Sequence, residues 1–196
     1  MAGGKKRARL EQRELVFIDE SGYYLLPFVA RTYAPTGCTP MLKVKHTRDH
    51  LSIMSGISPA GALFTMIRLE ALDGEAAVAF LRHVWRCVDR KLLVVWDGSP
   101  IHRGRTMRDF LENGAARHIH LEALPPYAPD LNPDEGVWRY TKCVELRNVC
   151  CLNLDDLRAH VRNVFGRLRQ RPRLIRSFFA EAKLALEMFS DFCNSQ

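Results

Sequence analysis

The segment "LLVVWDGSPIH", residues 92–102, decides the fold, because it places an uninterrupted apolar run directly before an aspartate. Five apolar residues without alternation are typical of a strand that is buried on both faces, inside a sheet covered by helices. The run ends at Asp97. We therefore expect an interior strand over 92–96, with Asp97 at its carboxyl end.

A second apolar run lies near the start of the chain. In "VFIDESGYY", residues 16–24, the run 15–18 stops at Asp19. Ser21 and Gly22 then predict a turn into another strand, so we expect a hairpin here. Pro27 has no N–H for a strand ladder and predicts a bulge or break in that second strand.

The rest of the chain continues this mixture of strands and helices. Short apolar segments bounded by turn residues predict further strands over 51–58, 61–69 and 117–125. Apolar residues at helical spacing predict helices over 75–89, 103–113, 133–146, 154–169 and 174–189. This order predicts an antiparallel meander followed by crossover helices and further helices at the end.

The two aspartates that follow the buried runs suggest a metal site. If strands 15–18 and 92–96 are parallel neighbours, Asp19 and Asp97 lie about one strand spacing, ~4.8 Å, apart. Two carboxylates this close repel unless a cation lies between them, which fits Mg²⁺ or Mn²⁺. The alternative is that each aspartate only supports a turn, in "DESG" and "DGSP". For either residue alone the alternative stays open.

A third acid would have to come from "NPDE", residues 132–135. Asn132, Pro133, Asp134 and Glu135 suit the N-cap and first three positions of a helix, and Asn-x-x-Glu is a capping-box pattern. Acids in a first turn also complement the helix dipole. Capping therefore explains this segment by itself, and a metal role needs another argument.

The charge distribution indicates a polyanionic partner. The chain has a formal net charge of +7, and no acid occurs from 157 to 180. The guanidinium fork binds phosphate oxygens in pairs, so arginines in such a stretch suit nucleic acid. The candidates are Arg158, Arg162, Arg167, Arg169, Arg171 and Arg173. The alternative is an ordinary solvated helix face.

Length and composition set the remaining limits. The 196 residues suit one domain, which we expect over 14–190, with 151–190 as a helical part and 1–13 as a flexible basic tail. No apolar stretch suits a membrane span or a secretory signal, so we expect a cytoplasmic protein without a membrane partner. The six cysteines form no CxxC pair, which favours buried thiols over a metal knuckle or redox motif.

Three blocks, in this order, resemble the signature blocks of the DDE-superfamily transposases, specifically the bacterial insertion-sequence relatives of mariner elements. They are "VFIDESGYY", "LVVWDGSPIH" and "LPPYAPDLNPDEGVWRYTK". The resemblance covers residues 14 to 150, and the last block is the most specific. It implies an α/β RNase H-like fold: a mixed five-stranded sheet, its first three strands antiparallel, flanked by helices.

The resemblance also implies a site. Asp19, Asp97 and Glu135 would be both the catalytic residues and the ligands of two Mg²⁺ or Mn²⁺ ions, with Glu135 selected over an exposed Asp134. His102 would pack or position a phosphate near the site. Asn132, Pro133 and Trp138 would support it, the first two by fixing Glu135 on a rigid turn and Trp138 by packing beneath.

The function that the resemblance implies is DNA transposition. Cleavage of phosphodiesters at transposon ends would be followed by transfer of the 3'-hydroxyl into target DNA, with double-stranded DNA as partner and a homodimer on it, in the bacterial nucleoid. Gly98 and Tyr33 depart from the residues common in the family. Because the chain begins almost at the first catalytic strand, we expect the helix-turn-helix part to be missing, joined by frameshifting or supplied in trans.

Two other functions remain open. A catalytically incomplete DNA-binding or regulatory fragment would use the arginine-rich region on phosphates. A different RNase H-like nuclease, acting on RNA:DNA hybrids or branched DNA, would use the same acids, but the Asn-Pro-Asp-Glu-x-x-Trp block argues against it.

Overall fold

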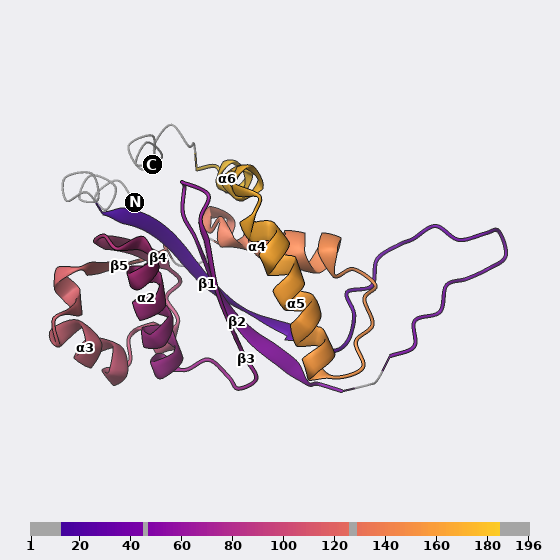
Figure 1. Cartoon of the computed structure of the whole chain (residues 1–196), viewed down its shortest axis with the longest axis horizontal. Helices are drawn as coiled ribbons and strands as arrows, with labels where there is room; N and C mark the ends of the chain where they lie inside the picture. The colour runs from indigo at the N-terminus through magenta and orange to yellow at the C-terminus, as the bar shows by residue number, and fades with distance from the viewer. Residues whose placement is uncertain (1–12, 45–46, 126–128, 185–196) are drawn as a thin grey trace.

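A five-stranded mixed sheet forms the centre of the protein. The computed structural model describes residues 13–44, 47–125 and 129–184 (Figure 1). The sheet order is β3-β2-β1-β4-β5, and the strands are β1 Glu14–Tyr24, β2 His50–Ile57, β3 Leu63–Arg68, β4 Leu92–Trp96 and β5 Ile119–Ala123. β1, β2 and β3 pair antiparallel, whereas β1, β4 and β5 pair parallel. The predicted sheet is confirmed.

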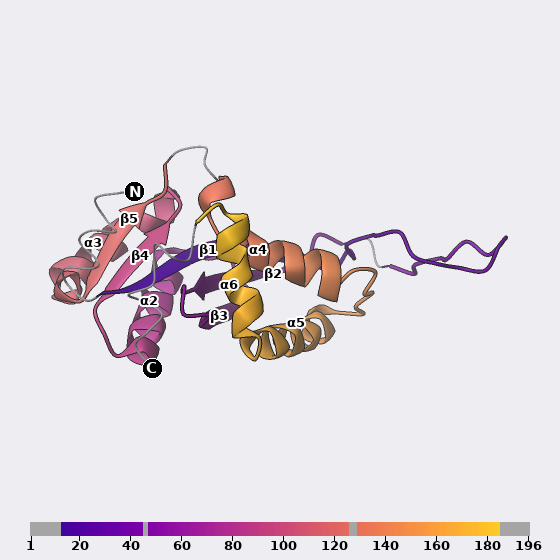
Figure 2. The same ribbon diagram turned by 90° about the horizontal axis from the view of Figure 1, so that it is seen from above.

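Helices cover both faces of this sheet (Figures 1 and 2). They are α2 Gly74–Val88, α3 Arg105–Glu112, α4 Asp134–Tyr140, α5 Leu154–Arg169 and α6 Pro172–Glu181. Short 3-10 turns occur at Pro100–His102, Ala115–Arg117 and Pro129–Leu131, and a π-helical turn, η4, covers Thr141–Glu145. α2 and α3 lie on one face, and α4, α5 and α6 lie on the other. None of the helices within the described ranges is long and apolar enough to cross a membrane.

Two hydrophobic cores explain why apolar and polar residues do not alternate along the central strands. Leu15 and Phe17 of β1 point into the core beneath α4, α5 and α6. Val16 and Ile18 point into the core beneath α2. A strand buried on both faces needs apolar residues at every position, which is the pattern seen in 15–18 and 92–96. The C-terminal helices α5 and α6 share the first core with the strands.

The hairpin predicted at Ser21 and Gly22 is wrong. β1 continues without a turn to Tyr24, and Ser21 and Gly22 pair with Ile53 and Ser52 of β2. A two-residue hairpin turn requires a positive φ, and Gly22 does not adopt one. The long partner strand β2 therefore overrides the local turn signal.

The strand predicted beyond Tyr23 is also absent. After Tyr24 the chain leaves the sheet, and residues 25–44 form a long excursion that projects from the body (Figures 1 and 2). An isolated bridge between Phe28 and Arg147 fixes its base. Tyr33 lies fully exposed within it. Pro27 lies beyond the end of β1 at Tyr24, and the second strand in which a bulge or break was predicted is not found among residues 25–44.

Other boundaries shift less. The helix predicted over 133–146 begins at Asp134 and changes to π-helical geometry at Thr141. The helix predicted over 174–189 begins earlier, at Pro172, and ends at Glu181, and residues 185–189 of that prediction lie outside the described part. Buried thiols were the wrong expectation for several cysteines. Cys38, Cys87 and Cys143 are exposed, Cys150 is half-buried and Cys151 is buried, whereas Cys193 lies outside the described residues.

Candidate active site

The three predicted acids line one cavity. β1 and β4 pair in parallel with Phe17 opposite Val95, so Asp19 and Asp97, each two residues further on, emerge side by side. Glu135 approaches from the first turn of α4. All three border a cavity of about 740 Å³. The pairing of buried parallel strands thus brings Asp19 and Asp97 to the sheet edge where such folds bind ligands.

Asp19 is held by the helix that carries Glu135. The indole N–H of Trp138 donates a hydrogen bond to the Asp19 carboxylate over 2.8 Å. Burial raises the pKa of Asp19 to about 6, which outweighs the lowering by the Trp138 and Glu20 hydrogen bonds, and the charges of Glu135 and Asp97 raise it further. A nearby cation would stabilise the charged form of a carboxylate in this position.

Asp97 sits in a turn and beside a histidine. Its carboxylate accepts the Ser99 backbone N–H at 2.9 Å, so it does support the "DGSP" turn. The same carboxylate is half-exposed and lies 3.1 Å from Nδ1 of His102. Asp97 therefore both supports a turn and lines the cavity. The turn role and the metal-site role, which were alternatives from the sequence, are compatible in this residue.

His102 is buried and both of its ring nitrogens have partners. Nε2 lies 2.7 Å from Oε1 of Glu20, and Nδ1 lies 3.1 Å from the backbone oxygen of Asp97. Its ring stacks on Trp96, with 3.7 Å between centroids. Burial lowers the pKa of His102, but the hydrogen bonds and charges of Glu20 and Asp97 outweigh this and raise it overall. This geometry favours the packing role, and a phosphate contact stays a prediction.

The start of α4 presents Glu135 to the cavity. The side-chain oxygen of the buried Asn132 accepts the backbone N–H of Asp134 at 3.2 Å. The Glu135 side chain is exposed, and the described part of the chain shows no bond from it back to the Asn132 N–H. Asn132 therefore caps this end while the Glu135 carboxylate stays available for a ligand.

Asp134 is not the exposed neighbour that the sequence suggested. It is fully buried, and its Oδ1 accepts the Ser55 hydroxyl at 2.7 Å. Its Oδ2 is buried without a hydrogen-bond partner. Burial and the charge of Asp19 raise the pKa of Asp134 well above its usual value. The reason is geometric: α4 packs across β1 and β2, so Asp134, its first residue, faces the sheet.

Sequence reasoning missed Lys142. Its ammonium lies 4.8 Å from the Tyr23 ring centroid and 5.9 Å from that of Trp138, and it bonds the Ser21 hydroxyl. Burial lowers the pKa of Lys142, although the charges of Glu135 and Asp19 oppose this. The available signal was its spacing of seven residues from Glu135, two helical turns on the same side.

The predicted phosphate-binding arginines divide into three groups. Three are engaged within the chain: Arg167 pairs with Glu145, Arg169 bonds Leu63 and Thr65, and Arg171 bonds Tyr140. Arg158 is half-buried, and its Nε has no partner. Arg162 and Arg173 are exposed. The structure thus leaves the outward residues Arg162 and Arg173 as the clearest candidates for phosphate contacts.

The donor set of the cavity fits a hard divalent cation. It consists of carboxylate oxygens, which Mg²⁺ and Mn²⁺ prefer. Among the described residues, only Cys151, Asp156 and His160 bring three donor atoms within 4.8 Å of one another. The carboxylate oxygens of Asp19, Asp97 and Glu135 are therefore spread more widely than this in the described part of the chain.

Comparison with known proteins identifies the family. A family model described as "DDE superfamily endonuclease" matches residues 14–158. The chain belongs to this family. The match spans all five strands and the segments that carry Asp19, Asp97 and Glu135. No curated protein matches the chain.

Solved structures of the Mos1 mariner transposase are similar in fold to this DDE endonuclease. A paired end complex with Mn has a TM-score of 0.68 at 14% identity, and covers 97% of this chain and 60% of that chain. The strand transfer complex has a TM-score of 0.65 at 16% identity, with coverage of 99% and 61%. The catalytic domain has a TM-score of 0.58 at 14% identity, with coverage of 94% and 88%. The chain thus spans about three fifths of the Mos1 chains in the two complexes and most of the catalytic domain alone.

Proposed function

We propose that this DDE endonuclease is the catalytic part of a transposase. It cuts DNA phosphodiesters at transposon ends and transfers the 3'-hydroxyl into target DNA. The observation that carries this proposal is the convergence of Asp19, Asp97 and Glu135 on one cavity, from two parallel strands and a helix start. The similarity to Mos1 paired end and strand transfer complexes supports it.

We propose two Mg²⁺ or Mn²⁺ ions as the cofactor, held by Asp19, Asp97 and Glu135. Mos1 structures with Mn and with Mg support the choice of metal. When bound, such ions activate a water or a 3'-hydroxyl for attack on phosphorus and stabilise the leaving oxygen. The buried environment that raises the pKa of Asp19 favours a cation beside it.

The protein's own residues fix the geometry of these acids. Trp138 orients the Asp19 carboxylate through its indole N–H, and His102 holds Asp97 against Glu20. Pro133 and Asn132 start the helix, so Glu135 is carried by a rigid first turn. Each acid therefore meets the substrate in a geometry set by its neighbours.

Double-stranded DNA is the proposed partner, bound in the cavity and along the arginines of α5 and α6. The active assembly would be a homodimer on DNA, as the paired end complexes of Mos1 suggest by analogy. We place this activity in the cytoplasm, on nucleoid DNA.

A regulatory fragment is the second candidate. It is favoured by the exposed side chains of Arg162 and Arg173, which are available for phosphate contacts that do not involve the three acids. Such a protein would bind DNA through phosphate contacts without cutting it. The arrangement of Asp19, Asp97 and Glu135 gives no reason for a loss of DNA cleavage.

A plasmid-nicking assay separates the two candidates. Supercoiled DNA is incubated with the chain and Mn²⁺, beside Asp97→Asn and Glu135→Gln, and beside Asp109→Asn as a control acid outside the cavity. We expect nicking by the wild type and the control, and loss of at least about 10²-fold in both site variants. Equal cleavage by all proteins contradicts the proposed site. Retardation of DNA by all of them, without cleavage by any, favours the regulatory fragment.

A further inference from the structure

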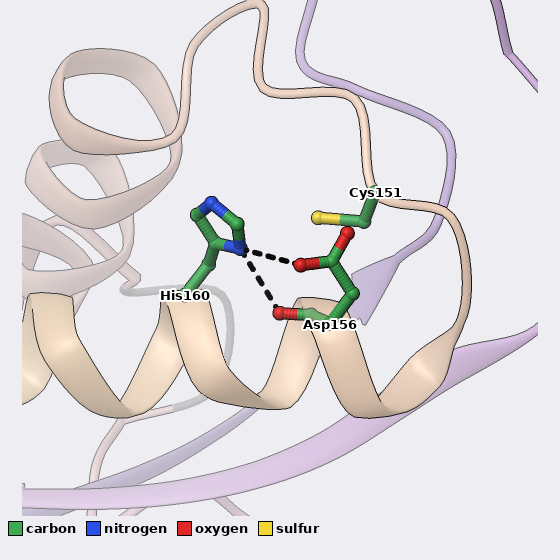
Figure 3. Close-up of side chains that lie close together, drawn as sticks. All are labelled: Cys151, Asp156 and His160. Carbon is green, nitrogen blue, oxygen red and sulfur yellow. Dashed lines mark hydrogen bonds and ion pairs between the residues drawn. The ribbon is translucent and has the colours of Figure 1, made fainter.

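A second group of side chains that could bind a metal ion lies outside the active site. Cys151 comes from the loop after η4, and Asp156 and His160 come from the first turns of α5. Figure 3 shows the three side chains directed toward one another. One donor atom from each lies within 4.8 Å of the others. Glu135, in the first turn of α4, is not part of this group.

The local sequence produces this arrangement. Asn153 caps α5 by accepting the Asp156 N–H at 2.9 Å, which fixes the first turn. The Asp156 carboxylate then accepts the Leu152 N–H at 3.0 Å and folds the loop back over the helix. His160 follows four residues later on the same side, with Nδ1 3.2 Å from Asp156 Oδ1. The fold-back brings the Cys151 thiol to this pair.

We propose that Cys151, Asp156 and His160 form a binding site for Zn²⁺ or a similar borderline-soft divalent cation. A thiolate sulfur, a carboxylate oxygen and an imidazole nitrogen are ligands that Zn²⁺ accepts, whereas Mg²⁺ prefers oxygen alone. Ligand atoms in a tetrahedral zinc site lie about 3.6 Å apart, given bond lengths of about 2.0–2.3 Å. Small side-chain rotations therefore close the site, and water takes the fourth position on its open side.

Ordinary helix capping does not account for the thiol. A capping aspartate and an i,i+4 Asp–His pair are common on exposed helices, but Cys151 is buried against this carboxylate. A cation bound between the Cys151 thiol and the Asp156 carboxylate would contact both groups. Zinc then replaces the thiol proton, which is released to solvent.

The ion would have a structural role. It would join the loop that leaves η4 to the first two turns of α5. α5 in turn packs Phe165 against Trp138, with 6.5 Å between ring centroids. The site does not depend on the catalytic proposal, because none of its ligands lines the active-site cavity.

Cobalt substitution tests this site. The full chain, stripped of metal by a chelator and kept reduced, is titrated with Co²⁺ in excess Mg²⁺. A thiolate-to-cobalt charge-transfer band reports sulfur ligation, which the carboxylates of the active site cannot produce. We expect one equivalent of Co²⁺ to give this band, Zn²⁺ to displace it, and Cys151→Ser to abolish it. His160→Gln should weaken binding by more than about ten-fold.

Two further variants make the result decisive. The His160 side chain is 45% exposed, so His160→Gln tests the site even if Cys151→Ser unfolds. Cys87→Ser is the matched control, because Cys87 lies 3.8 Å from His83 on α2 and forms another Cys–His pair. It should leave the band unchanged. A wild type without the band, a band that persists in Cys151→Ser, or one that only Cys87→Ser removes overturns the proposal.

Discussion

The indole N–H of Trp138 donates a 2.8 Å hydrogen bond to the carboxylate of Asp19. The two residues are 119 positions apart in sequence, and Trp138 lies three residues after Glu135. One helix start therefore presents one acid to the cavity and orients another. The "NPDEGVW" segment is thus both a helix start and a brace for β1.

Replacing Trp138 by Phe should weaken this brace. The aromatic contacts with Tyr23 and Phe165 survive in part, but the hydrogen bond to a half-buried carboxylate is lost. We expect the free energy of unfolding to fall by about 1–3 kcal/mol and the pKa of Asp19 to rise. Urea denaturation and an NMR titration of Asp19 measure these changes. The affinity for Mn²⁺ should also fall.

Trp85→Phe is the matched control for that experiment. Trp85 stacks on His118 on the other face of the sheet, with 4.6 Å between centroids. It should leave Mn²⁺ binding and DNA nicking unchanged. If Trp138→Phe binds Mn²⁺ and cleaves as the wild type does, the brace has no functional role.

The metal-free protein should gain stability from Asp19→Asn. Because the folded pKa of Asp19 is raised to about 6 from 3.8, its charged form disfavours folding. This cost is fully present above pH 6 and disappears below the usual value. At pH 7.5 we expect Asn to add up to about 3 kcal/mol to the free energy of unfolding. The gain should shrink as pH falls.

Urea denaturation at pH 7.5 and pH 5, with a chelator, measures this gain, and Asp109→Asn is the exposed control. Adding Mn²⁺ should raise the melting temperature of the wild type and hardly that of Asp19→Asn. A less stable Asp19→Asn protein at pH 7.5 would show that burial does not strain this carboxylate.

The parts of the fold that the sequence predicts well are those set by burial. The runs 15–18 and 92–96 are apolar at every position because two separate cores enclose them. The parallel pairing of β1 with β4, and hence the approach of Asp19 to Asp97, follows from that burial. The acids at the sheet edge could therefore be predicted from the local pattern.

What could not be predicted depends on partners distant in sequence. Ser21 and Gly22 carry a turn signal, but β2 pairs with both and keeps them extended. The side of α4 that Asp134 occupies is set by how the helix packs on the sheet, and Ser55 then supplies its hydrogen bond. Lys142 lies one helical turn after Trp138, but its contact with the Tyr23 ring comes from a strand distant in sequence.

The exposed arginines should contribute to DNA affinity in a salt-dependent way. For Arg162 and Arg173, the described ranges show no ion pair. Each that contacts a phosphate should contribute about 0.9 to the slope of log K against log salt. The double variant Arg162→Gln/Arg173→Gln should lower this slope, measured by fluorescence anisotropy with duplex DNA. Arg167→Gln, which breaks the pair with Glu145, should lower it less. An unchanged slope in the double variant would exclude both residues from the interface.

Gly136, next to Glu135, should not tolerate a side chain. A Cβ there would lie 2.7–2.8 Å from atoms of Phe178 on α6. Alanine favours a helix by about 1 kcal/mol, but overpacking typically costs about 1–3 kcal/mol, so we expect Gly136→Ala to lower the melting temperature. Gly136→Ala should also slow nicking, because the helix start that carries Glu135 must move away from α6.

Gly166→Ala on α5 is the matched control for Gly136→Ala. The added Cβ has open space around it, so this substitution should raise stability by about 0.4–1 kcal/mol. Equal effects of the two substitutions would contradict the close packing of α4 on α6.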